Sequence, residues 1–258
     1  MTQSPAIPAA TLILMRDAAE TPPAILMVER ARSMVFAGGA LVFPGGRIDP
    51  GDREIAATPA LIRSVGEIEP EDAAARVAAI RETIEESGIA PGFVRSPDHG
   101  LLAALRAEMA AGGDFGTLIA GHGLTIDLDL LVPFARWRPS FKESRIFDTR
   151  FYVARAPADA PEAVVDATEN VRLFWASAAA VLADCDSGNG HVIFPTRRNL
   201  ERLAGLAGFD QAAADARRHS VETITPWIEE RDGQRCLCIP EGRGYPVTAE
   251  PLAAAMRG

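Results

Sequence analysis

Three glutamates stand within five residues of the segment Arg81–Ile89, directly before Ser87 and Gly88. This run constrains the chain more than any other feature. On an α-helix, which turns about 100° per residue, Glu82, Glu85 and Glu86 fall within an arc of roughly 100°. The apolar residues that gather on the opposite side are Ala73, Val77, Ile80 and Ile84. The segment therefore predicts a helix with one buried face and one strongly acidic face.

The acidic face also predicts a bound cation. Carboxylates three or four positions apart repel each other and weaken a helix by roughly 0.2–0.5 kcal/mol per pair. A cluster that opposes its own helix, and lies opposite the buried side, indicates a positive ion between the carboxylates. Oxygen ligands suit a hard ion such as Mg²⁺ or Mn²⁺.

Composition and charge limit the partners that we expect. The chain has 258 residues, 48% of them hydrophobic and 24% charged, which is typical of a soluble globular protein. A net charge of −9 argues against nucleic acid and against an anionic membrane, because phosphate groups require a basic surface. We find no apolar stretch of about 20 residues and no secretory signal. Three cysteines without disulfide spacing favour a reducing cytoplasm.

Apolar runs and turn residues predict the elements of the first ninety residues. We expect paired strands at Thr11–Arg16 and Ala24–Arg30, and a third strand at Ala40–Phe43 that Pro44-Gly45-Gly46 ends sharply. Asp49–Pro70 reads as a loop that can include a helical turn around Thr58–Val65. Pro70 stands at the favoured first position of the acidic helix, and Gly88 is a helix stop.

The later elements intermix helices and strands without a repeat, so we expect one α/β domain. The expected helices are Leu101–Ala111, Trp175–Ala183, Arg197–Ala207 and Gln211–His219, and the expected strands are Thr125–Trp137 and Arg145–Ala154. The alternation of Asp127, Leu128, Asp129 and Leu130 supports the first of these strands. A terminal hairpin pairs Ile224–Glu230 with Arg235–Ile239.

The glycine pair and the acidic run together resemble the signature of Nudix hydrolases. That signature reads Gly, five residues, Glu, seven residues, then Arg-Glu-apolar-x-Glu-Glu-x-Gly-apolar. Its second half matches Arg81–Ile89 at every position except Thr83, where an aliphatic residue is usual. Five residues after Gly46 the chain has Asp52 in place of Glu, and 28 residues rather than seven separate it from Arg81. An insertion of 21 residues therefore splits the signature.

A split signature is similar to that of the peroxisomal-type coenzyme A diphosphatase branch. The further stretches that resemble this branch are Glu29–Arg32, Phe36–Asp49, Ala135–Trp137, Phe147–Tyr152 and Phe194–Thr196. The resemblance implies a Nudix α/β/α sandwich with a mixed β-sheet in a single domain over residues 1–258. It also implies an insertion at about 53–72 and a C-terminal extension of helices and a hairpin at about 175–258.

The resemblance implies hydrolysis of a diphosphate bond in a nucleoside diphosphate linked to another moiety, with Mg²⁺ or Mn²⁺ as cofactor. Coenzyme A or an acyl-coenzyme A is the first choice of substrate. ADP-ribose, NADH or a nucleotide is the second, and a non-catalytic ligand-sensing module on the same fold is a third reading. A homodimer is the only protein partner that the family suggests.

The resemblance also assigns roles to individual residues. Glu85 and Glu86 are the expected metal ligands, with Glu82 as a third ligand or the general base, and a carbonyl of Gly45 or Gly46 can complete the shell. Arg81 can orient the Glu85 carboxylate four positions later.

Guanidinium groups near the glycine pair can bind substrate phosphates, and we expect this of Arg30, Arg32 and Arg47. A surface salt bridge is the alternative for each. Ala78 and Ala79, on the carboxylate side of the helical wheel, would leave room for phosphates. Trp137 and Trp175 could stack on an adenine, although core packing is the stronger expectation.

Overall fold

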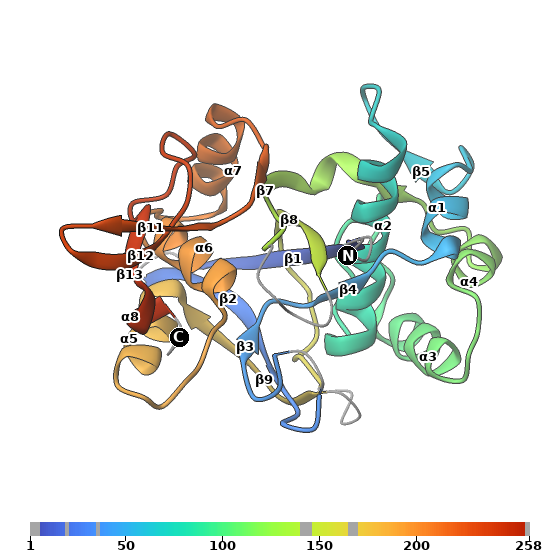
Figure 1. Ribbon diagram of the computed structural model, residues 1–258. Coiled ribbons are helices and arrows are strands. Elements are labelled where there is room, and N and C mark those ends of the chain that lie inside the picture. Colours follow the sequence, from blue (N-terminus) through green and yellow to red (C-terminus); the bar gives the residue numbers. More distant parts are fainter. Residues whose placement is uncertain (1–5, 19–20, 35–36, 140–145, 165–169, 256–258) are drawn as a thin grey trace.

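The structure is a computed structural model, and it describes residues 6–18, 21–34, 37–139, 146–164 and 170–255 (Figure 1). The part of the expected strand Arg145–Ala154 that precedes residue 146 lies outside these ranges. No helix among the described residues is both long enough and apolar enough to span a membrane. The three cysteines are free thiols, as expected from their spacing.

A mixed eight-stranded sheet forms the centre of the fold. Its main path runs β10 (Thr223–Ile224), β7 (Val132–Trp137), β8 (Phe147–Arg155), β1 (Ile7–Ala18), β2 (Thr21–Arg30) and β3 (Leu41–Val42). Two further strands join this path, since β4 (Gly45–Arg47) pairs with β1 and β9 (Asn170–Ser177) pairs with β2. β1 is antiparallel to β2 and parallel to β8, so the predicted first two strands are confirmed and the sheet is mixed.

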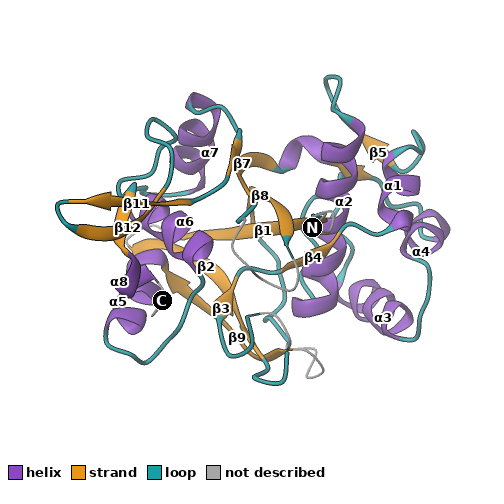
Figure 2. Ribbon diagram, viewed as in Figure 1, coloured by secondary structure: helices purple, strands orange, loops and turns teal. Residues whose placement is uncertain are grey.

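The two faces of β1 belong to different hydrophobic cores. Successive side chains of a strand point to opposite faces, and Leu12 and Leu14 pack in the core that contains α2 (Pro70–Ser87). Ile13 and Met15 pack in the other core, with helices α5 (Ala178–Asp186), α6 (Phe194–Ala204) and α7 (Phe209–Arg218). Helices α1–α4 accordingly lie to one side in Figure 2 and α5–α8 to the other. The predicted α/β/α architecture is confirmed.

Local signals set the bounds of α2 as predicted. Pro70 occupies its first turn, and the Glu69 carboxylate accepts hydrogen bonds from the amides of Glu71 and Asp72. Gly88 ends the helix in the left-handed conformation at φ 68°, which a glycine adopts without steric cost. Thr83, which departs from the signature, is fully buried, and its hydroxyl donates to the carbonyl of Ala79 at 2.7 Å.

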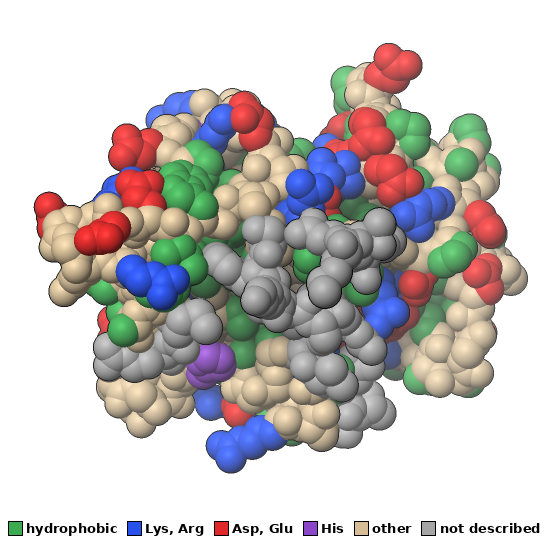
Figure 3. Space-filling model, in the orientation of Figure 1, with side chains coloured by type: hydrophobic (Ala, Val, Ile, Leu, Met, Phe, Trp, Pro, Cys, Tyr) green, Lys and Arg blue, Asp and Glu red, His purple; other side chains and the backbone are tan. Residues whose placement is uncertain are grey.

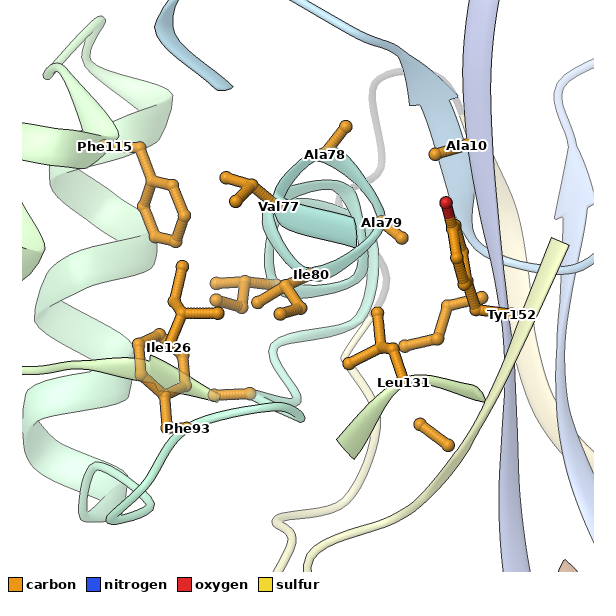
Figure 4. Packing of buried hydrophobic residues seen from close by; sticks show 14 of the residues in the cluster. Ala10, Val77, Ala78, Ala79, Ile80, Phe93, Phe115, Ile126, Leu131 and Tyr152 are labelled. Atoms are coloured by element: carbon orange, nitrogen blue, oxygen red, sulfur yellow. The ribbon is translucent and has the colours of Figure 1, made fainter. Parts of the chain in front are cut away.

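The alanines of α2 do not face the phosphate side as we expected. Ala78 and Ala79 are fully buried in the core. In Figure 4, Ala79 points toward Ala10 and Tyr152 of the sheet. α2 is covered on most of its circumference, because α1 and α3 pack on the faces that the sheet leaves free.

The glycine pair and the segment after it also differ from prediction. The predicted third strand is confirmed as β3, which ends at Val42 ahead of Pro44, but Gly45–Arg47 then forms a further strand, β4, which pairs antiparallel with β1. The helix that follows is α1 (Pro50–Ala56) rather than a turn around residues 58–65. Pro50 stands in its first turn and Asp49 forms a capping box with Asp52, signals that outweigh the small residues farther along. β5 (Ile62–Arg63) then pairs with β6 (Ile126–Asp127).

Two later predictions are wrong in part, for local reasons. The strand expected at Thr125–Trp137 is confirmed at β6 and β7, and the helix expected at Trp175–Ala183 is confirmed from Ala178 onward. The alternating residues after Asp127 form a 3₁₀ turn (Leu128–Leu130), because the Asp127 carboxylate accepts a hydrogen bond from the amide of Asp129. Trp175 belongs to β9 and not to a helix, since α5 begins only after Ser177, whose hydroxyl caps it.

The remaining elements follow the predicted order. The predicted helix after α2 is α3 (His99–Ala110), which packs against α2, and the two late helices α6 and α7 are present. α4 (Phe115–Gly121), which was not predicted, packs against α1. β11 (Trp227–Arg231) and β12 (Gln234–Cys238) form the predicted hairpin, joined by β13 (Ala249–Pro251) and followed by α8 (Leu252–Ala255).

Candidate active site

The three glutamates of α2 and the glycine strand β4 lie next to each other in the wall of one cavity of about 1350 Å³. Glu82, Glu85 and Glu86 line this cavity together with Gly45 and Gly46. Figure 3 shows acidic and basic side chains gathered over α1 and the neighbouring end of α2. The fold therefore brings together the two halves of the signature, which are far apart in the sequence.

Close packing around β4 requires both glycines, Gly46 against α2 and Gly45 against β1. A Cβ atom on Gly46 would lie 2.3 Å from Oε1 of Glu82. A Cβ atom on Gly45 would lie 2.4 Å from the carbonyl oxygen of Ala10, and the Gly45 amide donates to Oε2 of Glu86 at 3.0 Å. The glycine pair thus allows two of the three carboxylates to lie against the strand.

Arg81 connects the carboxylates to the split part of the signature. Its guanidinium is largely buried and donates to both oxygens of Asp52, from Nε at 2.9 Å and from Nη2 at 3.0 Å. Nη1 donates to Oε1 of Glu82 at 3.0 Å and to Oε2 of Glu85 at 3.1 Å. A bidentate pair of this kind fixes the plane of the guanidinium. Asp52, which is 1% exposed, therefore reaches the site in spite of the insertion that follows it.

Burial shifts the protonation of the glutamates. Burial away from solvent raises the pKa of Glu82 to about 7, although the positive charge of Arg81 acts to lower it. Burial, reinforced by the charge of Glu82, raises the pKa of Glu86 to about 8. Burial likewise raises the pKa of Glu85. A raised pKa means that the ionised form of a carboxylate is disfavoured, so a nearby positive charge would stabilise that form.

The donor set fits a hard divalent cation. Three carboxylates line one cavity beside the glycine pair, and carboxylate oxygens are ligands that Mg²⁺ and Mn²⁺ prefer. Within the described ranges, no three His, Cys, Asp or Glu side chains already surround a common point as metal ligands do. In this arrangement the Arg81 guanidinium bridges Glu82 and Glu85.

The three candidate phosphate-binding arginines differ in position. Arg30 is partly buried and lines the cavity, and Arg47 is exposed and lines it. Arg47 also accepts a hydrogen bond from Arg81 through its carbonyl at 3.0 Å. Arg32 is exposed and, among the described residues, does not belong to the cavity lining.

The tryptophans have mainly packing roles. Trp137 is 1% exposed, and its indole N–H donates to the hydroxyl of Tyr245 at 3.1 Å. Its ring meets those of Phe194 and Tyr245 edge to face. Trp175 lies under the guanidinium of Arg16, whose Cζ is 4.1 Å from the ring centroid.

Two residues of the site carry no signal in the sequence pattern. Arg106 of α3 donates from Nε to the carbonyl of Glu85 at 3.0 Å and from Nη2 to that of Glu86 at 3.4 Å. These carbonyls belong to the last turn of α2, where a cation is favourable. Asn170 of β9 donates from Nδ2 to Oε1 of Glu86 at 3.1 Å. α3 also contains His99 and Glu108, so its sequence does not single out Arg106, and nothing local singles out Asn170.

The cavity extends from the carboxylates in two directions. On one side it is lined by α3, including Leu102, Ala103 and Ala107. On the other side the sheet and α6 contribute Phe43, Phe147, Phe151, Ile193 and Pro195. The volume and the apolar walls leave room for groups much larger than a diphosphate on both sides of the acidic centre.

Comparison with known proteins supports the fold. No family model matches the chain. The structure is similar to a NUDIX hydrolase from Alicyclobacillus acidocaldarius with a TM-score of 0.73 and 29% sequence identity. The match covers 83% of this chain and 97% of that one.

Two other solved structures are more distant. A MutT protein from Methanosarcina mazei Go1 has a TM-score of 0.42 and 13% identity, over 79% of this chain and 96% of that chain. The NUDIX domain of Shewanella oneidensis NrtR, solved with ADP ribose, has a TM-score of 0.40 and 13% identity, over 70% and 78%. The assignment of the fold rests on the first comparison.

Proposed function

We propose that this chain is a Nudix hydrolase, as its similarity to the NUDIX hydrolase from Alicyclobacillus acidocaldarius supports, and that it catalyses the metal-dependent hydrolysis of a diphosphate bond that links a nucleoside to a second moiety. One observation carries the proposal: three carboxylates of α2 line one cavity beside the paired glycines of β4, with Arg81 holding two of them. A diphosphate resists attack because its own oxygens repel a nucleophile. Bound Mg²⁺ or Mn²⁺ supplies charge neutralisation and lowers the pKa of a coordinated water.

The glutamates and glycines of the site have proposed roles as metal ligands and as the general base. Glu82, Glu85 and Glu86 would hold the cation, with a carbonyl of Gly45 or Gly46 as a further ligand. Glu82 would act either as the third of these carboxylate ligands or as the general base, since it lines the same cavity as Glu85 and Glu86.

Arg81 and the cavity arginines have supporting roles in this proposal. Arg81 orients the carboxylates of Glu82 and Glu85 through its two Nη1 hydrogen bonds. Arg30 and Arg47 would bind the substrate phosphates from the rim, since guanidinium groups match phosphate oxygens. Arg32 lies outside the cavity lining given above, so its contribution would be indirect.

Coenzyme A or an acyl-coenzyme A is the proposed substrate. The split signature is similar to that of the coenzyme A diphosphatase branch. A cavity of about 1350 Å³ exceeds the roughly 300–1,000 Å³ of ordinary small-ligand sites. Its apolar walls on both sides of the acidic centre suit a base on one side and a pantetheine chain on the other.

Product analysis tests this substrate. The purified protein is incubated with Mg²⁺ or Mn²⁺ and with coenzyme A, ADP-ribose or NADH in parallel, and the products are separated by chromatography. We expect 3′-phospho-AMP and phosphopantetheine from coenzyme A. Hydrolysis of ADP-ribose or NADH without any hydrolysis of coenzyme A would overturn the substrate and favour the second reading.

Replacement of Glu85 by Gln tests the ligand-sensing alternative. An enzyme should lose turnover, because the substitution removes a charged ligand from the acidic centre. A sensor should keep its affinity for the ligand and show no turnover in either form. The complete set of three glutamates speaks against a sensor, which has no need of them.

A further inference from the structure

Glu86 is held at both carboxylate oxygens by groups outside its own helix. The amide N–H of Gly45 donates to Oε2 at 3.0 Å, and Nδ2 of Asn170 donates to Oε1 at 3.1 Å. Glu86 is 5% exposed and Asn170 is 1% exposed. Two hydrogen bonds from different strands fix the plane of the carboxylate, because each oxygen is tied to a separate point of the fold.

Both of these donors are neutral, which distinguishes them from the Arg81 guanidinium on Glu82 and Glu85. A carboxylate has about four lone-pair sites on its two oxygens. One hydrogen bond at each oxygen leaves further acceptor sites for a cation. A neutral amide also leaves the negative charge of the carboxylate in place, whereas a guanidinium would offset part of it.

A β-bulge aims Asn170 at the site. In the ladder between β2 and β9, Glu29 is opposite Arg172 and Arg30 is opposite Asn170, so Val171 is an extra residue with no partner. Directly opposed residues of an antiparallel pair share a face of the sheet. Without the extra residue Asn170 would point to the other face, because a slip of one position reverses every side chain. Val171 is 58% exposed, as expected of the bulged position.

Arg30, which is opposite Asn170, shows that this face of the sheet is the one toward the cavity. It lines the cavity, and its charge acts on Glu86. Bulges beside active sites commonly redirect a side chain in this way.

We propose that Asn170 is a positioning residue that orients the Glu86 carboxylate to bind the divalent cation of the active site. The inference rests on the proposed metal-dependent function and adds a residue that lies outside the signature. Partners that orient metal ligands typically affect metal affinity or activity by 10- to 100-fold when they are removed. Asn170 lies 84 positions from Glu86, so only the pairing of β9 with β2 brings them together.

Direct measurement of Mn²⁺ binding tests the proposal. Isothermal titration calorimetry without substrate compares the wild-type protein with N170A, which removes the amide, and N170L, which keeps about the same size but removes the donor without adding a charge. We expect the dissociation constant for Mn²⁺ to rise by about 10- to 100-fold in both variants. At saturating Mn²⁺ the KM for substrate should stay within about threefold of the wild-type value. N189A, at an exposed asparagine, is the matched control and should bind Mn²⁺ as the wild type does.

A folded N170A or N170L protein that binds Mn²⁺ within about twofold of the wild-type affinity overturns the proposal. Circular dichroism checks the fold, and if N170A fails to fold, N170L decides. A purely structural role would lower the melting temperature without changing the affinity of the folded protein. Mn²⁺ binding does not depend on which diphosphate is cleaved. A wild-type protein that binds Mn²⁺ but cleaves no coenzyme A therefore refutes the substrate and leaves the role of Asn170 testable.

Discussion

The two adjacent glycines of β4 should respond to alanine in opposite ways, since different atoms meet the new methyl group. In G46A the Cβ would lie 2.3 Å from Oε1 of Glu82, the free end of a flexible side chain that can move aside. In G45A it would lie 2.4 Å from the carbonyl oxygen of Ala10 and 2.7 Å from Cα of Thr11, which are backbone atoms of the central strand β1. One substitution displaces the Glu82 carboxylate and the other strains the sheet.

The sizes of the two effects follow from the overlaps. Glu82 must move by roughly 1 Å to reach van der Waals contact, and a misplacement of about 1 Å can cost on the order of 100-fold in rate. We therefore expect kcat of G46A to fall about 100-fold, or about 2.7 kcal/mol in the barrier. Overpacking against backbone costs about 1–3 kcal/mol, so G45A should lower the melting temperature by roughly 2–12 °C.

Steady-state kinetics and thermal unfolding of the two variants form one matched experiment. G46A should keep a melting temperature within a few degrees of the wild-type value while it loses activity. G45A should lose stability whatever its residual activity. A G46A protein with wild-type kcat, or two variants with the same profile, would show that the carboxylate does not depend on the bare backbone of β4.

Three further outcomes follow from the site. Burial raises the pKa of Glu82 to about 7 and that of Glu86 to about 8, above the ordinary 4.5. The folded metal-free protein therefore favours the protonated carboxyls, and this contribution to stability is complete below about pH 4.5 and is lost as the pH rises through 7–8. The melting temperature of the metal-free protein should fall over this pH range, the fall should be smaller in E86Q, and Mn²⁺ should reverse it. An E86Q protein with the same dependence of melting temperature on pH would contradict the role of Glu86. D52A should destabilise the protein by about 3–5 kcal/mol in urea unfolding, because it removes one partner of a buried ion pair, and a loss below about 1 kcal/mol would place that pair in solvent. R47A should raise KM about tenfold with little change in kcat, whereas R32A should leave both unchanged; equal effects on KM would mean that the cavity lining does not define the phosphate contacts.

The acidic helix was predictable because its signals are local. Pro70, the spacing of the glutamates and Gly88 lie within one continuous segment, and helical periodicity converts that spacing directly into a shared face. The predicted strands β1 and β2 are confirmed for the same reason, since apolar runs beside a turn act at short range. The errors fall where one local signal outweighed another, as in α1, where the capping box at Asp49 sets the helix start.

Which groups surround the carboxylates was not predictable from spacing. The sequence placed Asp52 at the signature position but did not show whether its side chain reaches the site past the insertion. In the fold, both carboxylate oxygens of Asp52 accept hydrogen bonds from Arg81. Ala78 and Ala79 share the glutamate side of an ideal wheel, yet they are buried because neighbouring elements cover that part of α2.

By itself the sequence determined a helix that carries three carboxylates, the paired glycines suited to approach it, and the order of strands and helices around them. The tertiary structure alone decided that β4 continues the sheet beneath Glu82, and that Arg106 and Asn170 bind the end of α2 and Glu86. The physical reason is range. Helix caps and periodicity depend on residues within a few positions of one another, whereas the position of Asn170 depends on the register of two strands more than 130 residues apart, and a single extra residue in that ladder reverses the direction of its side chain.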